Sequence, residues 1–376
     1  MKPRQLPLFR RGNFLRLTRV TQSLATAEYR CPGENYSISR AVHLARLADV
    51  YPGCFDCPCR HDTAGLSARQ VRRLAEIDTR RQNRPWFGVE GMRDVPINEV
   101  SVPAARMIAI EFARRLWDDA ADARPTLVFA GDGRLSTTTI VAAVVEGIRW
   151  TGCETVDLGP ASAPCMAQAI ERLEADGGIY LGNPGGAAHT LGMKFWAHGE
   201  LLSDGPLFDA IAAAIEAHAV GPAIDRPARA FGPLRRVAAA DNYLSDLRPA
   251  YHALRPLRFV LHSTCEPVLS YLEDLMQNVA CRATAADPAS RIGEQVAAAG
   301  AHFGIEITDD GQNARVFDER GAAVATERLL ASLAGEIGEA CTVTADALRT
   351  LTLLLVLLSR DDLPLSTVLD RAAVKK

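Results

Sequence analysis

Short apolar runs alternate with amphipathic helical stretches along most of this chain, and this alternation limits the folds open to it. Strands are expected at 125–130, 153–158, 178–181, 257–261, 302–307 and 314–317. Helices are expected at 67–82, 100–117, 136–151, 165–173, 208–218, 267–278, 327–338, 345–359 and 366–373. Ser67 is a suitable N-cap for the first of these helices. Short strands separated by helices predict an α/β fold of layered units with mixed, mostly parallel sheets.

Prolines and glycines interrupt the pattern around residues 219–240, which predicts a linker between two α/β domains. The predicted order is an N-terminal segment (1–84), a first domain (85–218), the linker (219–240), a second domain (241–325) and a helical end (326–376). The N-terminal segment contains a basic arm, a cysteine cluster and a helix.

Charge and composition exclude several classes of partner. A net charge of −3 and a pI near 6.3 give no basis for nucleic-acid binding or for binding an anionic membrane. The first 30 residues carry seven Lys or Arg against one acid, which is typical of a solvated arm, with a binding element as the alternative.

The longest apolar run, 351–358, is far shorter than the ~20 residues that span a bilayer. Residues 1–17 lack the apolar core of a secretory leader. Nine mostly isolated cysteines fit a reducing compartment, so we expect a cytoplasmic protein.

Cysteine and histidine residues cluster at Cys54, Cys57, Cys59 and His61, with Cys31 upstream. Thiolate and imidazole ligands at this spacing suit tetrahedral zinc. A set of Cys31, Cys54, Cys57 and either Cys59 or His61 therefore predicts a structural zinc site. The alternative is a loop of unpaired, partly buried thiols.

Four motifs occur in order between residues 87 and 195: FGVEGMR at 87–93, AGDGRLS at 130–136, VDLG at 156–159 followed by Ala163-Pro164, and GGIYLGNPGGAAHTLGMKF at 177–195. They resemble segments of the α-D-phosphohexomutases, the phosphoglucomutases and phosphomannomutases, which read FGTSGIRG, GRDTRLSS, VDLG…TP and GGVMITASHNPPEYNGIKF. The likeness runs from about residue 86 to 321, with a weaker echo to the C-terminus. It implies the first two domains of that family and a helical remnant of the third.

The resemblance also implies a phosphoserine in the 177–195 segment, and this chain has none. Aligned without gaps, the serine position is Pro184. Matching Asn183-Pro184 to the family's Asn-Pro moves that position to Leu181. Neither residue has a nucleophile to phosphorylate. His189 and Thr190 lie in the same loop, but no base or orienting group is evident for either.

Three cationic residues lie in the matched motifs, Arg93, Arg134 and Lys194, and the resemblance places Lys194 where the family has a substrate-side lysine. Phosphate recognition needs positive charge, and strand ends of α/β sheets are where ligands bind, so we expect these residues to share a cleft. His189 and the backbone amides of Gly185 and Gly186 are expected to add contacts. The alternative is that the three cations form ordinary surface ion pairs.

The family's metal loop, DGDADR, is reduced here. The matching stretch keeps Asp310 of three aspartates, with Asp309 beside it, and has Gln312 and Ala314 in the other two places. Magnesium sites of this kind need more carboxylates, so we do not expect magnesium. The GEESGH sugar-reading loop and the phosphate-binding fourth domain of the family have no counterpart in the sequence.

These losses favour a pseudoenzyme that binds a phosphosugar or a phosphate-like anion and acts as a regulatory or scaffold subunit. An active phosphoglucomutase- or phosphomannomutase-like enzyme of carbohydrate metabolism with a non-standard site is the alternative. A purely structural role for the N-terminal module, and a protein partner or a second copy of the chain, stay open.

Overall fold

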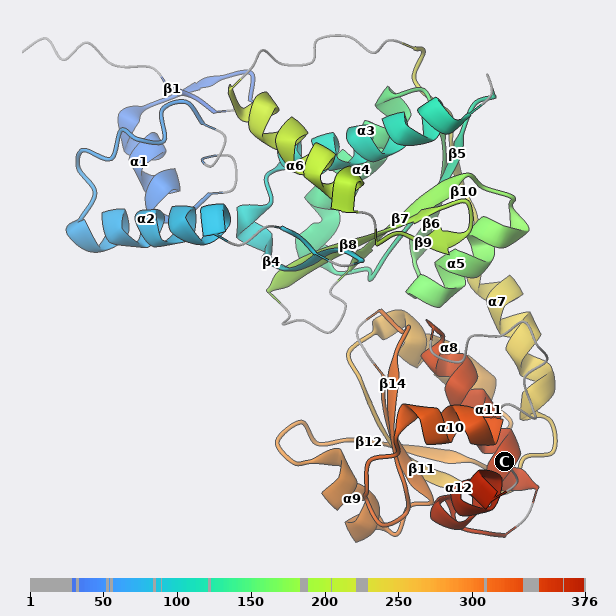
Figure 1. Cartoon of the computed structure of the whole chain (residues 1–376). Coiled ribbons are helices and arrows are strands. Elements are labelled where there is room, and N and C mark those ends of the chain that lie inside the picture. Colours follow the sequence, from blue (N-terminus) through green and yellow to red (C-terminus); the bar gives the residue numbers. More distant parts are fainter. Residues whose placement is uncertain are drawn as a thin grey trace, which may run out of the picture.

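The computed structural model describes residues 29–374, except 32–33, 52–53, 55–56, 84–85, 89, 121–122, 183–188, 204, 221–228, 308–309, 334–344 and 361. An N-terminal module lies at the left of a first α/β unit in Figure 1, and a second α/β unit lies below the first. Among the described residues, no helix has both the length and the apolarity needed to cross a bilayer.

The first unit is built on an eight-stranded mixed sheet in the order β10-β6-β5-β7-β8-β4-β3, with β9 paired to β8. Pairing is parallel from β10 to β7 and antiparallel from β7 to β3. The strands are β3 (Phe87–Gly88), β4 (Gly91–Pro96), β5 (Thr126–Gly131), β6 (Glu154–Pro160), β7 (Gly177–Gly182), β8 (Thr190–Ala197), β9 (Glu200–Leu201) and β10 (Leu234–Arg236).

Helices cover both faces of this sheet because its central strands are buried on both sides. Leu127 and Phe129 of β5 pack toward α3 (Val102–Asp119), α4 (Thr138–Trp150) and α6 (Gly205–Val220). Val128 and Ala130 alternate with them and pack toward α5 (Ala163–Arg172). Gly147 lets α4 approach α3 closely, since a Cβ there would lie 2.6 Å from the Arg106 carbonyl oxygen.

The second unit has a four-stranded sheet in the order β12-β11-β13-β14, in which only β14 is antiparallel to its neighbour. Its strands are β11 (Arg258–Ser263), β12 (Arg282–Ala285), β13 (Phe303–Ile307) and β14 (Ala314–Phe317). Its helices are α7 (Ala240–Leu247), α8 (Glu266–Met276), α9 (Ile292–Ala299), α10 (Thr326–Leu333), α11 (Ala347–Ser359) and α12 (Leu365–Val374). Helix α9 packs against one face, on Val260 and Phe317, and α8, α10, α11 and α12 share a core on the other.

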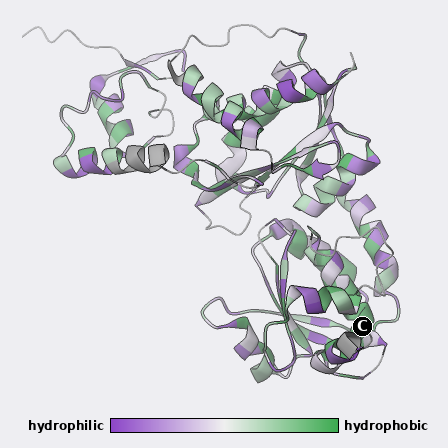
Figure 2. Ribbon diagram, in the orientation of Figure 1, coloured by the Kyte–Doolittle hydropathy of each residue, from purple (hydrophilic) through white to green (hydrophobic). Residues whose placement is uncertain are grey.

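One hydrophobic cluster is continuous between the two units. It contains α5 and Tyr180 of the first unit together with α7, α8, β11 and α11 of the second. Hydrophobic stretches run along the helices that lie against the second sheet (Figure 2). The C-terminal helices therefore complete the second unit rather than standing apart from it.

The N-terminal module pairs β1 (Tyr29–Arg30) with β2 (Ser37–Ile38) and adds helices α1 (Arg40–Ala48) and α2 (Ala68–Asn83). Ser67 caps helix α2 as predicted, and the helix begins at Ala68. The Ser67 hydroxyl accepts from Gln70 N at 3.3 Å, and the Gln70 side chain accepts from Ser67 N at 2.9 Å.

The predicted α/β fold class with mixed sheets is confirmed. Several elements were missed, chiefly β4, β8, β10, β12, α7 and α9. Part of the predicted linker is not an extended connection: residues 234–236 form the edge strand β10, which pairs in parallel with β6.

Candidate functional site

The segment expected to hold a nucleophile lies between β7 and β8. Leu181 is fully buried inside β7 and pairs with Met193, so it is a sheet residue and not a loop residue. Pro184, Gly185 and Gly186 lie outside the described residues, and their predicted roles stay predictions. His189 is exposed, and its carbonyl oxygen accepts a hydrogen bond from Ile97 N at 3.1 Å. Thr190 is 6% exposed.

Lys194 points away from solvent, toward the second unit. Its side chain is 2% exposed, and its Nζ lies 2.7 Å from Oδ2 of Asp310, which is 1% exposed. It also donates a hydrogen bond to the Gln312 amide oxygen and lies 3.7 Å from Glu90 Oε2. Sequence reasoning singled out Lys194 and Asp310 separately, and the tertiary structure brings them into contact.

A tight turn places Glu90 beside this lysine. Strands β3 and β4 pair at Gly88 and Gly91, and Glu90, just before Gly91, has a φ of 68°. A left-handed conformation costs a residue with a side chain about 1–2 kcal/mol. Gly91 must be glycine here, since its φ is 108° and a Cβ would lie 2.3 Å from the Met193 carbonyl oxygen. Backbone strain of this kind is often found at functional sites.

Arg134 and Arg93 are also paired with acids. Arg134 Nε lies 2.5 Å from Asp132 Oδ2, and its guanidinium donates to the Thr190 carbonyl oxygen at 2.9 Å, which ties it to β8. The Arg93 side chain is 51% exposed and lies 3.5 Å from Glu90 Oε2. Glu90 thus contacts both Arg93 and Lys194. Each of the three predicted cations faces a carboxylate. Arg93 is the one whose charge is most open to solvent.

The described residues of the reduced metal loop contact Lys194, and the expectation of no magnesium stays a prediction. The loop's one described carboxylate, Asp310, already faces the Lys194 ammonium, and the Gln312 oxygen accepts from the same group. Asp309 lies outside the described residues. Magnesium demands oxygen ligands in near-octahedral array, and the ammonium that binds these two oxygens occupies space that an ion would need.

The cysteine cluster packs within the N-terminal module. Cys31, Cys54 and Cys57 are buried, Cys59 is half-buried and His61 is exposed. Arg46 donates to Cys31 Sγ at 2.9 Å. Burial raises the pKa of Cys54 to about 12 and raises the pKa of Cys57, which favours neutral thiols in this arrangement. Within the described ranges no three His, Cys, Asp or Glu side chains converge on a metal position, and the structural zinc stays a prediction.

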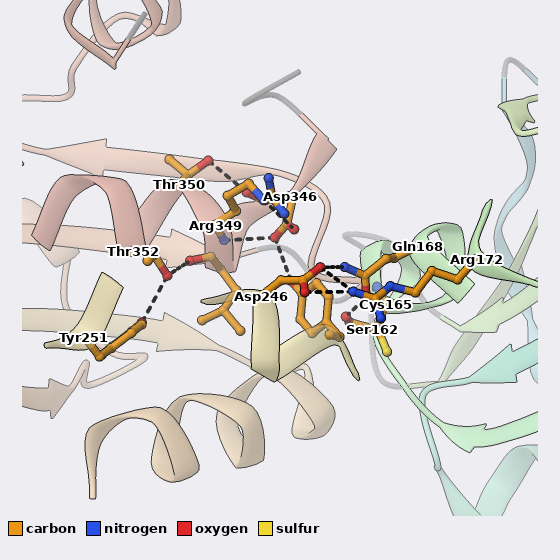
Figure 3. A network of polar contacts seen from close by, with 12 residues as sticks. Ser162, Cys165, Gln168, Arg172, Asp246, Tyr251, Asp346, Arg349, Thr350 and Thr352 are labelled. Carbon is orange, nitrogen blue, oxygen red and sulfur yellow. Dashed lines mark hydrogen bonds and ion pairs between the residues drawn. The ribbon is translucent and has the colours of Figure 1, made fainter. Parts of the chain in front are cut away.

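A second polar region, which sequence reasoning missed, lies between α5, α7 and α11 (Figure 3). Arg172 and Gln168 of α5 both bind the Asp246 carboxylate at 2.7 Å, and Tyr243 donates to Asp346 at 2.8 Å. The region borders a cavity of about 970 Å³ at the junction of the units. Its acidic lining includes Glu171, Glu174, Asp176 and Glu200. No spacing in the sequence indicates this region, because its residues meet only through tertiary packing.

Asp346 in this region supports a pH-dependent prediction. It caps α11 by accepting from Arg349 N at 2.9 Å, yet burial raises its pKa above the ordinary value. A raised pKa in the folded state means that the carboxylate increasingly opposes folding as pH rises from about 3.9 through that raised pKa. Asp346→Asn keeps the capping oxygen, so we expect it to increase the free energy of unfolding at neutral pH. The gain should vanish at acid pH, as measured by urea unfolding across a pH series.

The matched control is Asp362→Asn, at a side chain that is 98% exposed and whose ion pair with Arg255 should contribute little. Its effect on stability should not vary with pH in the same window. A loss of stability in Asp346→Asn at neutral pH would contradict the prediction.

Comparisons with known proteins agree with the geometry. Residues 84–219 match the family model for phosphoglucomutase/phosphomannomutase, alpha/beta/alpha domain I. Phosphoglucosamine mutase of Maricaulis maris is 25% identical over 279 residues, which cover 68% of this chain and 61% of that protein. The enzyme of that name from Neisseria meningitidis serogroup B is 26% identical over 184 residues, 47% of this chain and 40% of that protein. The chain thus spans about half the length of these curated relatives.

Solved structures show the same fold. A phosphoglucomutase/phosphomannomutase family protein from Burkholderia thailandensis superimposes with a TM-score of 0.61 and 18% identity, covering 76% of this chain and 79% of that one. A putative phosphomannomutase from Thermus thermophilus gives a TM-score of 0.59 and 17% identity, covering 77% and 83%. These findings support a member of the α-D-phosphohexomutase family, with the family model matched over the first α/β unit.

Proposed function

We propose that this protein is a pseudoenzyme of its family that binds a phosphosugar or a related anion and does not transfer the phosphoryl group. The observation that carries the proposal is the ion pair between Lys194 and Asp310, at 2.7 Å and with both side chains buried. The pair turns the counterpart of the family's substrate-side lysine and the surviving metal-loop carboxylate toward each other. A phosphoryl-transfer site needs both groups directed at phosphate and metal.

The same arrangement indicates where an anion would bind. Arg93 is half exposed and lies on β4, which pairs with β8, the strand of Lys194. His189 is exposed and immediately precedes β8. A guanidinium presents a planar fork of donors that matches phosphate oxygens. Because the curated relatives are phosphoglucosamine mutases, glucosamine phosphates join glucose and mannose phosphates as candidate ligands. The role in the cell would be regulatory or structural within carbohydrate metabolism.

The test is thermal unfolding of the purified protein with the 1-phosphates of glucose, mannose and glucosamine, glucose 6-phosphate and inorganic phosphate, beside a coupled mutase assay. A ligand that binds only the folded state raises the melting temperature, so we expect a rise without turnover. Arg93→Ala should weaken binding about 10- to 100-fold, the usual effect of losing one charged hydrogen-bonding group.

Arg235→Ala is the matched control, because Arg235 is 47% exposed, pairs with Glu154 at 2.7 Å and lies on the distant edge strand β10. It should leave binding unchanged. Turnover of any phosphosugar would overturn the proposal and favour the non-standard enzyme. Equal losses of ligand affinity in the two variants would show that Arg93 is not part of the binding site. No response to any ligand would favour a scaffold role.

A further inference from the structure

Lys194 is the only lysine between residues 3 and 374. The chain has 38 arginines and four lysines, and the other three lysines are Lys2, Lys375 and Lys376. The arginine guanidinium is planar and presents several N–H donors, whereas the lysine ammonium is a compact point charge with three donors. The buried cation beside Asp310 is therefore a lysine in a chain whose other cations are almost all arginines.

Oxygen atoms from separate segments surround that ammonium. Asp310 Oδ2 lies 2.7 Å away, the Gln312 amide oxygen accepts a hydrogen bond, and Glu90 Oε2 lies 3.7 Å away. Asp310 and Gln312 follow β13 of the second unit, whereas Glu90 comes from the hairpin before β4 of the first. An arrangement of carboxylate and amide oxygens around a central positive charge is the electrostatic pattern of a hard-cation site.

Asp310 and Gly311 are held by contacts from both units. Their backbone carbonyl oxygens accept hydrogen bonds from Ala163 N of α5 at 2.9 Å and from Ala347 N of α11 at 3.0 Å. The Asp310 Oδ1 accepts from Gln312 N at 3.1 Å. Gly311 has a φ of 80°, and a Cβ there would lie 2.8 Å from Val268 Cγ2 and 3.2 Å from Ser162 Cβ. Asp310 and Gly311 therefore connect the second unit to α5 of the first, next to Lys194.

We propose that the Lys194 ammonium is the resident cation of this site, in the place of a divalent ion, and that it joins the two α/β units without metal. The second carboxylate that would raise the charge of the site is absent at the Gln312 position, and one ammonium balances the buried Asp310. A divalent ion would have to displace the Lys194 side chain, and it would find only one buried carboxylate, that of Asp310, as a ligand. The inference holds whether or not a phosphosugar binds, and its test contains no sugar.

The experiment measures the melting temperature with magnesium chloride, manganese chloride or sodium chloride at matched ionic strength. Wild-type protein should show no response specific to the divalent ions. Lys194→Ala removes the ammonium and leaves space beside the Asp310 and Gln312 oxygens, so it should melt at a lower temperature. Magnesium or manganese should then raise that temperature by on the order of a few degrees. The double variant Lys194→Ala with Asp310→Asn should not respond, since no buried carboxylate remains and the Glu90 side chain is 40% exposed.

A wild-type melting temperature that rises with manganese, and loses the rise in Asp310→Asn, would overturn the inference. Equal responses of the single and double variants would overturn it too. A second measurement needs no Lys194 variant and tests the proposal if that variant does not fold. Wild-type protein is titrated with manganese, and the free ion is followed by electron paramagnetic resonance. We expect no Asp310-dependent binding, and one manganese ion per chain that Asp310→Asn abolishes would contradict the proposal.

Discussion

Lys194→Met is expected to lower the free energy of unfolding by about 3–5 kcal/mol, the usual result of removing one member of a buried ion pair. Methionine fills nearly the same volume but leaves the Asp310 carboxylate, 1% exposed, without its ammonium. The remaining hydrogen bond from Gln312 N does not replace that charge. Urea unfolding at neutral pH measures the loss.

A double-mutant cycle separates the charge from the packing. Lys194→Met combined with Asp310→Asn has no buried charge at this position, so most of the lost stability should return. If the double variant is no more stable than Lys194→Met, the ion pair is not the origin of the loss. The same cycle applied to Arg315 and Glu306, an exposed pair at 2.9 Å, should give a coupling of about 0–1 kcal/mol.

Phe195→Ala is expected to lower the free energy of unfolding by about 3–5 kcal/mol, because a large buried ring is replaced by a cavity. Phe195 on β8 is fully buried, and its ring lies 5.2 Å from Phe112, 5.8 Å from Phe208 and 6.3 Å from Phe87. These partners come from α3, α6 and β3, so the substitution removes packing contacts with three separate elements of the first unit. Chemical denaturation followed by circular dichroism measures it.

Phe231→Ala is the matched control, with the same chemical change at a ring that is 48% exposed. Phe231 contacts the Arg149 guanidinium at 5.6 Å, so a loss of at most about 1 kcal/mol is expected. Equal losses in the two variants would show that β8 does not hold the core together as described.

Local patterns in the sequence predicted most of the helices and the central strands. Strand β5 and helices α3 and α4 differ from their predicted bounds by one or two residues, because a buried apolar run and a 3.6-residue period are visible without a fold. Strand β8 was missed, since its eight residues are all buried and show no alternation. Strand β10 was missed because Leu234, Arg235 and Arg236 are exposed and gain their structure only from the edge of β6.

The sequence by itself determined the α/β class and the family resemblance, and it predicts that no serine stands at the expected position, since these depend on residue identity and order. Only the tertiary structure decided what the remaining charged residues do. Lys194 and Asp310 are separated by more than a hundred residues, and no local pattern relates a strand of one unit to a turn of another. Burial then determines the outcome, because a charge removed from water must have a partner, and the nearest opposite charge is on the other unit.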